Sequence, residues 1–228
     1  MLNYHIISSD SQGGNSVKIG DIIVDAGISY KELEPWLYGV KYILITHQHC
    51  DHYKIGTLHR IKQEHPEILL IGNYEVATRE RDLSLFGTPN QKRSHHEEYL
   101  FDRITRSGYP VDMIDQIIIP YDVPHNVKVN AYDWYDKNGN HIFYMTDCLD
   151  SSVLDEYIPA RNRYDYMFLE ANHDADKLEQ VRNQHTSYDV FGGGMRHLSK
   201  QHAKEFYYEH RVNVDSPWIR LHKSARFY

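Results

Sequence analysis

A cluster of histidine and aspartate side chains constrains this chain more than any other feature of its sequence. The segment THQHCDH contains His47, His49, Asp51 and His52, and it directly follows an apolar run at 42–45. The preceding run is short and rich in aromatic and β-branched residues, whereas apolar residues recur at helical spacing just after the cluster. The pattern therefore predicts a loop that leads from a strand into a helix.

The spacing within the cluster is typical of metal ligands. His47 and His49 are separated by one residue, so in an extended loop both imidazoles can point to the same side and bind one ion. Asp51 and His52 lie where the chain turns into the helix, and they could bind a second ion nearby. A single histidine is usually an exposed residue, but four candidate ligands in six residues at a strand end favour metal binding.

Three later residues could complete such a site, because each follows a predicted strand or turn. His125 follows the apolar run at 117–120 and could be the third histidine of the first ion. Asp147 comes at the end of another predicted strand, where a carboxylate could bridge two ions. His197 follows a glycine-rich turn and could complete the second ion. Each of the three taken alone is more often a surface, hydrogen-bonded or capping residue, so the prediction depends on their joint placement.

The length and composition indicate one domain over residues 1–228, since a chain with 41% hydrophobic residues can fill a sizeable core. Apolar runs and turn residues predict strands near 4–8, 16–19, 21–25, 68–71, 117–119, 127–134, 141–145 and 165–169. Helical patterns predict helices within 74–85, 95–106, 151–157 and 199–209. The polar stretch at 79–106 could be a lid or a dimer-contact insertion. A strand meander followed by alternating strands and helices favours sheets that are covered by helices on their outer faces.

The net charge and the cysteine content limit which binding partners and which cellular compartment are expected. The formal net charge of −7 argues against a protein that binds nucleic acid over its whole surface, although a local cationic site is compatible with this charge. Cys50 and Cys148 are the only cysteines, so no disulfide framework is expected and a reducing cytoplasm fits best. The N-terminus has no leader pattern, and no apolar run is long enough to span a membrane. We therefore expect a cytoplasmic protein with no membrane partner.

These motifs together resemble the metallo-β-lactamase fold hydrolases. THQHCDH matches the H-x-H-x-D-H signature of that superfamily, and His125, Asp147 and His197 match its later metal-binding positions in order and context. The opening segment SSDSQGGNSVKIGDIIVDAG is similar to the family's first hairpins, which end in a D-x-G turn. The resemblance runs nearly end to end and implies an α/β fold, the αββα four-layer sandwich, with the metal site along one edge.

Within the superfamily, the chain looks closest to the WalJ/YycJ-type branch of single-domain, nuclease-like proteins. VPHN around His125, FLEANHD at 168–174 and RHLSKQHA at 196–203 carry this similarity. The chain departs from the branch at Arg196, where a small residue is usual, and the segment 177–196 matches poorly. These departures concern the substrate rather than the metals.

The predicted chemistry is hydrolysis of a phosphodiester by a hydroxide held between two divalent ions, zinc or alternatively manganese. Asp51 could orient the attacking water or accept its proton, and His173 could protonate the leaving oxygen with Glu170 as its orienting partner. His173 could equally be a capping or solvent-facing residue, and Arg196 could contact a phosphate. Cys148 is an alternative to Asp147 as a ligand, but Asp147 is in register with the family's aspartate.

The expected substrate is a nucleic acid or a small, even cyclic, nucleotide, and a homodimer is a further expectation. One alternative is an enzyme that hydrolyses a carboxylic substrate, a β-lactam or a thioester, on the same metals. Another is a metal-stabilised module that binds a nucleotide without catalysis, although a purely structural zinc site needs only four closed ligands.

Overall fold

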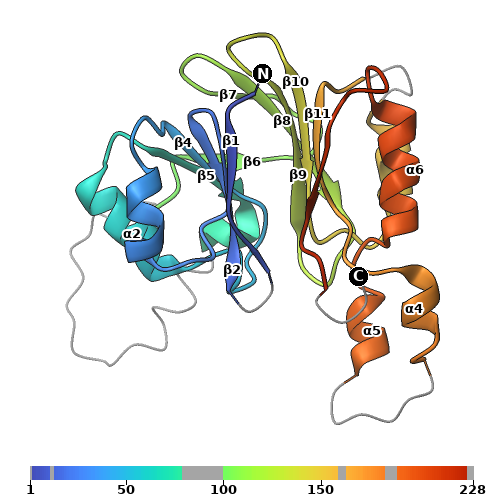
Figure 1. Cartoon of the computed structure of the whole chain (residues 1–228). Helices are drawn as coiled ribbons and strands as arrows, with labels where there is room; N and C mark the ends of the chain where they lie inside the picture. The colour runs from blue at the N-terminus through green and yellow to red at the C-terminus, as the bar shows by residue number, and fades with distance from the viewer. Residues whose placement is uncertain (1, 11–12, 79–99, 159–162, 183–188, 225–228) are drawn as a thin grey trace. The chain divides into compact units, whose positions relative to one another are not determined.

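The computed structural model describes residues 2–10, 13–78, 100–158, 163–182 and 189–224 (Figure 1). Backbone contacts divide the chain into two compact units. Unit 1 comprises Met1–Ser8 and Gln12–Thr105, and unit 2 comprises Ser9–Ser11 and Arg106–Tyr228. The single domain over 1–228 stays a prediction, and most of the proposed insertion, residues 79–99, lies outside the described residues.

Unit 1 is built on a six-stranded sheet with the order β1-β2-β3-β4-β5-β6. Its strands are β1 (Tyr4–Asp10), β2 (Gly14–Ile19), β3 (Ile22–Val24), β4 (Tyr42–Ile45), β5 (Leu69–Asn73) and β6 (Arg103–Thr105). Its helices are α1 (Tyr30–Leu33), the 3-10 helix η1 (Glu34–Trp36) and α2 (Ile55–Glu64), with a further helical turn at 74–78. Strands β3 to β6 are parallel, so their carboxyl ends share one edge of the sheet. The loop with the histidine cluster leaves β4 at this edge.

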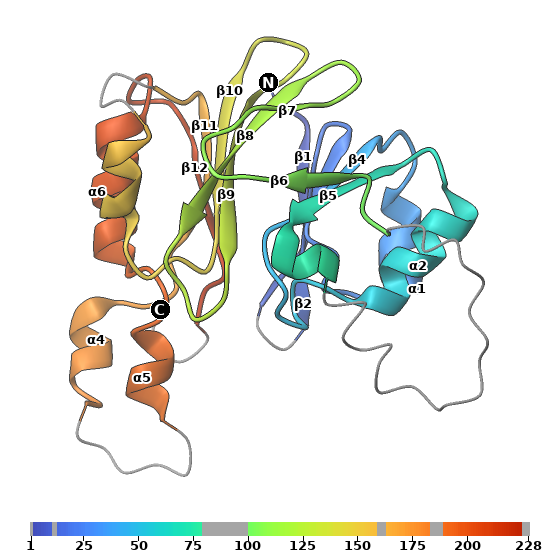
Figure 2. The ribbon, with the colours of Figure 1, turned by 180° about the vertical axis from the view of Figure 1, so that it is seen from behind.

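The core of unit 1 explains why α2 lies against its sheet in both views (Figures 1 and 2). Ile43 and Ile45 of β4 share one hydrophobic cluster with Leu58 and Ile61 of α2, and all four are fully buried. The alternation of a strand places Ile43 and Ile45 on one face, and the helical spacing of Leu58 and Ile61 matches that face. The loop that carries the histidine cluster, residues 46–54, is named the cluster loop here. Both of its ends are therefore fixed in the core.

Unit 2 contains a second six-stranded sheet with the order β12-β11-β10-β9-β8-β7. Its strands are β7 (Val111–Asp112), β8 (Ile117–Val123), β9 (Val129–Tyr135), β10 (His141–Met145), β11 (Tyr166–Glu170) and β12 (Trp218–Leu221). Its helices are the 3-10 helix η2 (Ser151–Glu156), α4 (Ala175–Glu179), α5 (Val190–Gly194) and α6 (Lys200–His210). Strands β7 to β10 pair antiparallel, whereas β10, β11 and β12 are parallel. Asp147, Glu170 and His222 thus follow or end three neighbouring strands that point the same way.

Helix α6 covers one face of the unit 2 sheet (Figures 1 and 2). Ala203 and Phe206 of α6 pack in one buried cluster with Phe143 of β10 and Met167 of β11. The Phe143 and Phe206 ring centroids are 5.3 Å apart, a favourable aromatic contact. This packing fixes the start of α6, which directly follows the loop that carries His197.

Most of the predicted strands are confirmed, and the elements that differ are short. The predicted helix within 95–106 is wrong over Arg103–Thr105, because these residues pair with β5 as strand β6. The segment at 151–157 is a 3-10 helix rather than an α-helix, and β7 and β12 were not predicted. In the described part of the chain, no helix has the length and apolar character needed to cross a membrane.

Candidate metal centre

The cluster loop of unit 1 is tied to the segment after β3 by backbone and side-chain hydrogen bonds. Thr46 donates its backbone N–H and its hydroxyl to Asp25 Oδ1, at 2.8 and 2.9 Å. The Ala26 N–H donates to the carbonyl of His52 at 3.0 Å, and the Lys54 N–H donates to that of Ala26 at 3.1 Å. These bonds hold both ends of the loop, so the ligand residues project from a fixed backbone.

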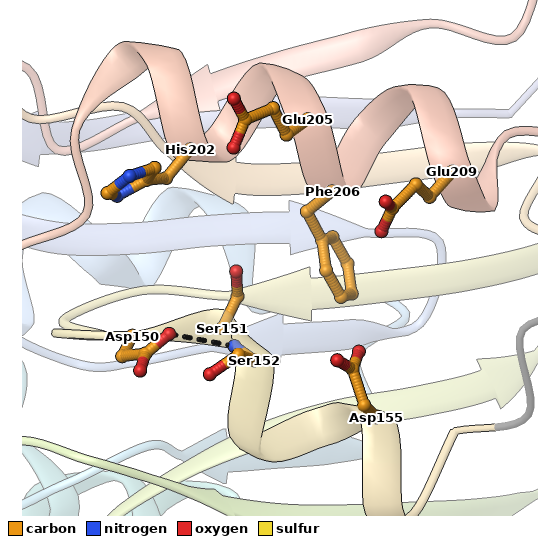
Figure 3. A pocket seen from close by; sticks show the side chains of 8 residues that line it. All are labelled: Asp150, Ser151, Ser152, Asp155, His202, Glu205, Phe206 and Glu209. Atoms are coloured by element: carbon orange, nitrogen blue, oxygen red, sulfur yellow. Dashed lines mark hydrogen bonds between the residues drawn. The ribbon is translucent and has the colours of Figure 1, made fainter.

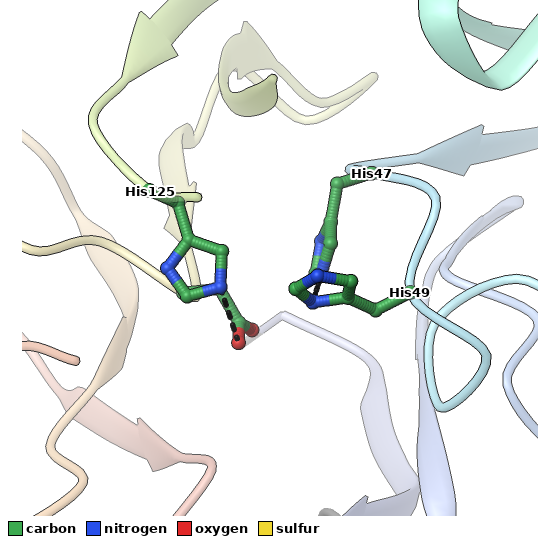
Figure 4. Close-up of side chains that lie close together, drawn as sticks. His47, His49 and His125 are labelled. Carbon is green, nitrogen blue, oxygen red and sulfur yellow. Dashed lines mark hydrogen bonds and ion pairs between the residues drawn. The ribbon is translucent and has the colours of Figure 1, made fainter. Parts of the chain in front are cut away.

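His47 and His49 point to the same side of the loop, as the sequence predicts (Figure 4). His47 Nε2 lies 3.0 Å from His49 Nδ1, with His47 fully buried and His49 half-buried. Two nitrogen ligands of a tetrahedral zinc ion with bonds of about 2.0–2.1 Å lie roughly 3.3 Å apart. The two ring nitrogens are therefore spaced to share one ion.

Asp25 is a buried carboxylate that orients His52. Its Oδ2 lies 2.7 Å from His52 Nδ1, and both side chains are fully buried. Burial raises the pKa of Asp25, although His52 and Thr46 favour its ionised form. A histidine that binds a metal through one ring nitrogen commonly donates the other N–H to a carboxylate, and this arrangement has that form.

The other ring nitrogen of His52 lies beside Asp51. His52 Nε2 is 3.6 Å from Asp51 Oδ2, and the amide nitrogen of Asn15 lies 2.8 Å from the first and 3.3 Å from the second. An amide donor thus faces both candidate ligands, and a cation could replace it. Asp51 and His52 together fit the half of a metal site that the sequence predicts for them.

In unit 2, His125 and Asp147 form the first part of a second ligand set, and Figure 4 shows His125. His125 Nδ1 lies 3.0 Å from the carbonyl of Arg196, and Nε2 lies 3.9 Å from Asp147 Oδ1. Burial lowers the pKa of His125 although Asp147 raises it, so the imidazole is neutral near pH 7. Neutral imidazole is the form that binds a metal.

Glu170 is the centre of the rest of that set. Its Oε1 lies 2.7 Å from His197 Nδ1 and 3.1 Å from His222 Nδ1. Its Oε2 accepts the backbone N–H groups of Cys148 and Leu198, at 3.0 and 3.2 Å. Burial alone would raise the pKa of Glu170, but the charge of His197 and the side-chain hydrogen bonds to His197 and His222 hold it at about 2. Glu170 is thus an ionised, fully buried carboxylate that orients two histidines, as Asp25 orients His52.

Asp147, Glu170, His197 and His222 offer ligand atoms that all lie within 4.8 Å of one another. His222 was missed by the sequence reasoning, because it follows the short strand β12 and no recognisable motif surrounds it. The donor set of carboxylates and imidazoles in each unit is that of a divalent metal such as zinc.

Backbone strain marks the same residues. Among the described non-glycine residues, positive φ angles occur at Asp25, Asp147 and His222, with values of 65°, 52° and 49°. Such conformations are uncommon for residues with a side chain, and they tend to collect where function requires them. The backbone conformation therefore marks His222, which no sequence motif does.

Other predicted site residues have less suitable surroundings. His173 is 4% exposed, and its Nδ1 has no hydrogen-bond partner among the described residues. Burial lowers its pKa, so it is mostly unprotonated near pH 7. The Cys148 thiol is fully buried and burial raises its pKa, which disfavours the thiolate that a metal would need. Asp147 remains the better candidate ligand at this turn.

A cavity of about 310 Å³ in unit 2 lies between η2 and α6 (Figure 3). Four carboxylates line it, from Asp150, Asp155, Glu205 and Glu209, and the Asp150 carboxylate accepts the Ser152 N–H at 2.9 Å. None of the candidate metal ligands lines this cavity. Its negative charge would repel an anionic substrate, so it is not where a phosphodiester would bind.

Comparison with known proteins identifies the fold. No family model and no curated protein matches the sequence. Solved structures do match. The metallo-β-lactamase fold protein YhfI from Bacillus subtilis is 16% identical over 98% of this chain and 86% of that protein, with a TM-score of 0.64. The short form of human tRNase Z is 16% identical over 99% and 93%, with a TM-score of 0.65. A diphosphatase of the PhnP family is 15% identical over 100% and 89%, with a TM-score of 0.59.

The class of the protein follows from this similarity: it is an α/β protein with the metallo-β-lactamase fold, and the predicted fold class is confirmed. Two six-stranded sheets, each with helices packed on it, are the elements that the αββα fold requires. Sequence identities near 16% establish a shared fold but not a shared reaction. The WalJ/YycJ-type branch stays a prediction.

Proposed function

We propose that the protein is a metal-dependent hydrolase that cleaves phosphodiester bonds in a nucleic acid or a small nucleotide. The observation that carries this proposal is the matched pair of ligand sets, one in each unit, in which a buried carboxylate orients histidines. Asp25 does so in unit 1 and Glu170 in unit 2. Such outer carboxylates are typical partners of histidines that bind a metal.

The ligands are proposed to bind two ions. His47, His49 and His125 would hold the first, and Asp51, His52 and a histidine of unit 2 would hold the second. Asp147 would be shared by both. The sequence predicts His197 as the histidine of the second ion, but His222 has the strained backbone typical of a functional residue, and we assign this role to it. Zinc suits the donor set, and manganese is the alternative.

Two cations bound there would lower the pKa of a water molecule and offset the negative charge of the phosphoryl oxygens. Asp51 is placed beside His52 Nε2, where it could orient that water and accept its proton. The net charge of −7 does not prevent this, because the local charge of the site decides whether an anion binds.

The leaving oxygen needs a proton, and His197 suits this role better than His173. Burial lowers the pKa of His197, but Glu170 more than compensates and the net shift is upward. A donor with a pKa close to the working pH is the most effective general acid. His173, the residue that the sequence suggests, is held unprotonated by burial. We therefore propose His197 as the acid and Glu170 as its positioning residue.

The test is a screen of the zinc- or manganese-loaded protein against linear DNA, RNA, cyclic nucleotides and bis-p-nitrophenyl phosphate. A β-lactam and a thioester are included as carboxylic substrates. We expect turnover of at least one phosphodiester and none of the carboxylic compounds. Turnover of the carboxylic compounds alone would establish the alternative enzyme class. Nucleotide binding without turnover would establish a binding module.

A further inference from the structure

A second cavity, in unit 1, borders the cluster loop. Its volume is about 540 Å³, within the range of sites that hold small ligands. It lies where α1 and α2 begin, and it is lined by Ser29, Tyr30, Cys50, Tyr53, Lys54, Ile55, Gly56 and Thr57. No candidate metal ligand is among the lining residues.

The lining combines apolar walls with one cation at the rim. Tyr30 and Tyr53 are buried and Ile55 is half-buried, so they form fixed apolar walls, whereas Lys54 is exposed. Glu32 is close enough to Lys54 to interact electrostatically, but its carboxylate already accepts the N–H and hydroxyl of Ser29. A ligand that fits this lining has a flat or apolar body and a negative charge at one end.

The cavity is continuous with the cluster loop. Cys50, on the rim, lies between the proposed ligands His49 and Asp51 in the sequence, and Tyr53 directly follows His52. The hydrogen bond from the Lys54 N–H to the Ala26 carbonyl fixes the lining to the same backbone that positions these ligands. The cavity and the proposed ligands of unit 1 therefore belong to one fixed stretch of backbone.

We propose that this cavity binds the nucleoside on the uncleaved side of the phosphodiester, with the base against the apolar walls and Lys54 near the phosphate. This inference rests on the proposed function and narrows its substrate to nucleoside phosphodiesters. The acidic cavity of unit 2 is unsuited to this role because its four carboxylates would repel the phosphate.

Gly56 allows a direct test. Gly56 lines the cavity, and a Cβ added at this position would meet no atom within 4 Å, so a larger side chain can be added there without a backbone clash. Gly56→Phe is the blocking variant. Gln63→Phe adds the same bulk at an exposed position of the same helix that does not line the cavity, and it is the matched control.

Two substrates with the same leaving group separate nucleoside binding from chemistry. Thymidine 5′-(p-nitrophenyl phosphate) carries a nucleoside, and methyl p-nitrophenyl phosphate carries a methyl ester in its place. We expect Gly56→Phe to lower the ratio of kcat/KM for the first to that for the second at least about fivefold, the low end for loss of one stacked base. The ratio should stay at the parent value in Gln63→Phe.

Alkylation of Cys50 gives a readout that needs no turnover. Cys50 is exposed and Cys148 is buried, so maleimide should label Cys50 selectively, and mass spectrometry can assign the label. We expect thymidine 5′-phosphate at about ten times its Kd to slow the labelling of Cys50 in the metal-loaded parent roughly tenfold. The protection should be weakened in Gly56→Phe.

The two measurements distinguish failure of this inference from failure of the proposed function. If both esters are hydrolysed, an unchanged ratio in Gly56→Phe together with unprotected Cys50 would overturn the nucleoside cavity and leave the function standing. If neither ester is hydrolysed, the proposed function fails. The labelling experiment then decides alone whether the cavity binds a nucleotide.

Discussion

Individual carboxylates determine which ring nitrogen each histidine of the site presents. Asp25 is the clearest case, because its carboxylate is hydrogen-bonded to both His52 and Thr46. Loss of such an outer partner typically weakens metal binding about 10- to 100-fold. We expect Asp25→Asn to weaken the binding of one ion by this factor.

Competition with a chromophoric chelator measures the affinity of the Asp25→Asn variant. Glu67→Gln, which changes a carboxylate that is 69% exposed, serves as the control. Unchanged affinity for both ions in Asp25→Asn would show that His52 does not bind a metal in this way.

The two histidines on Glu170 are expected to differ in function. His222→Ala should lose one ion, since it removes a ligand, whereas His197→Ala should retain both ions and slow turnover about 10²- to 10⁴-fold, as loss of a general acid does. Elemental analysis measures the bound ions and initial rates measure turnover.

Loss of an ion in His197→Ala but not in His222→Ala would return His197 to the ligand set that the sequence predicts. Slow turnover with both ions retained in His173→Ala would restore His173 as the acid.

Local sequence patterns predicted some site residues and could not predict others. His47, His49, Asp51 and His52 are visible because spacing alone brings them together after a strand. Glu170 is hydrogen-bonded to His197 and His222, which are 27 and 52 residues away in the sequence. No local sequence pattern could have predicted these bonds.

At the level of elements, the sequence predicts segments with a clear apolar pattern well and segments without one poorly. Strand β4 was predicted from its continuous apolar run, and helix α2 from apolar residues at helical spacing. Strand β6 has only 3 residues, with Arg103 and Ile104 exposed, so it carries no alternation and was assigned to a helix. Strand β12 has 4 residues and depends on pairing with β11 rather than on its own pattern.

The start of α6 supports a stability prediction. Ser199 caps this helix, since its hydroxyl accepts the His202 N–H at 3.2 Å. Removing such a cap typically costs about 0.5–2 kcal/mol. We expect Ser199→Ala to lower the free energy of unfolding by about that amount in urea titrations. Ser199→Thr keeps a hydroxyl and should lose much less. Equal stability of the Ala variant and the parent would show that the cap contributes nothing.

For the whole molecule, metal binding should stabilise the folded chain. Ions that bind the folded chain and not the unfolded one raise its stability by mass action, by about 2.7 kcal/mol at a hundredfold excess over Kd. We therefore expect chelation with EDTA to lower the melting temperature and readdition of zinc to restore it. Identical melting curves with and without EDTA would show that the folded chain does not retain metal.

Asp147 is proposed to join two ions into one phosphodiesterase site. Asp147→Asn preserves size but removes the charge that would hold the second cation, so His47, His49 and His125 should still bind the first. Asp150→Asn, at the exposed carboxylate three positions later, is the control. The measurement is zinc stoichiometry together with the initial rate on bis-p-nitrophenyl phosphate. We expect two ions in the parent and the control, one in Asp147→Asn, and a rate at least about a hundredfold lower in that variant. Two retained ions with an undiminished rate in Asp147→Asn would show that Asp147 does not join the two ions.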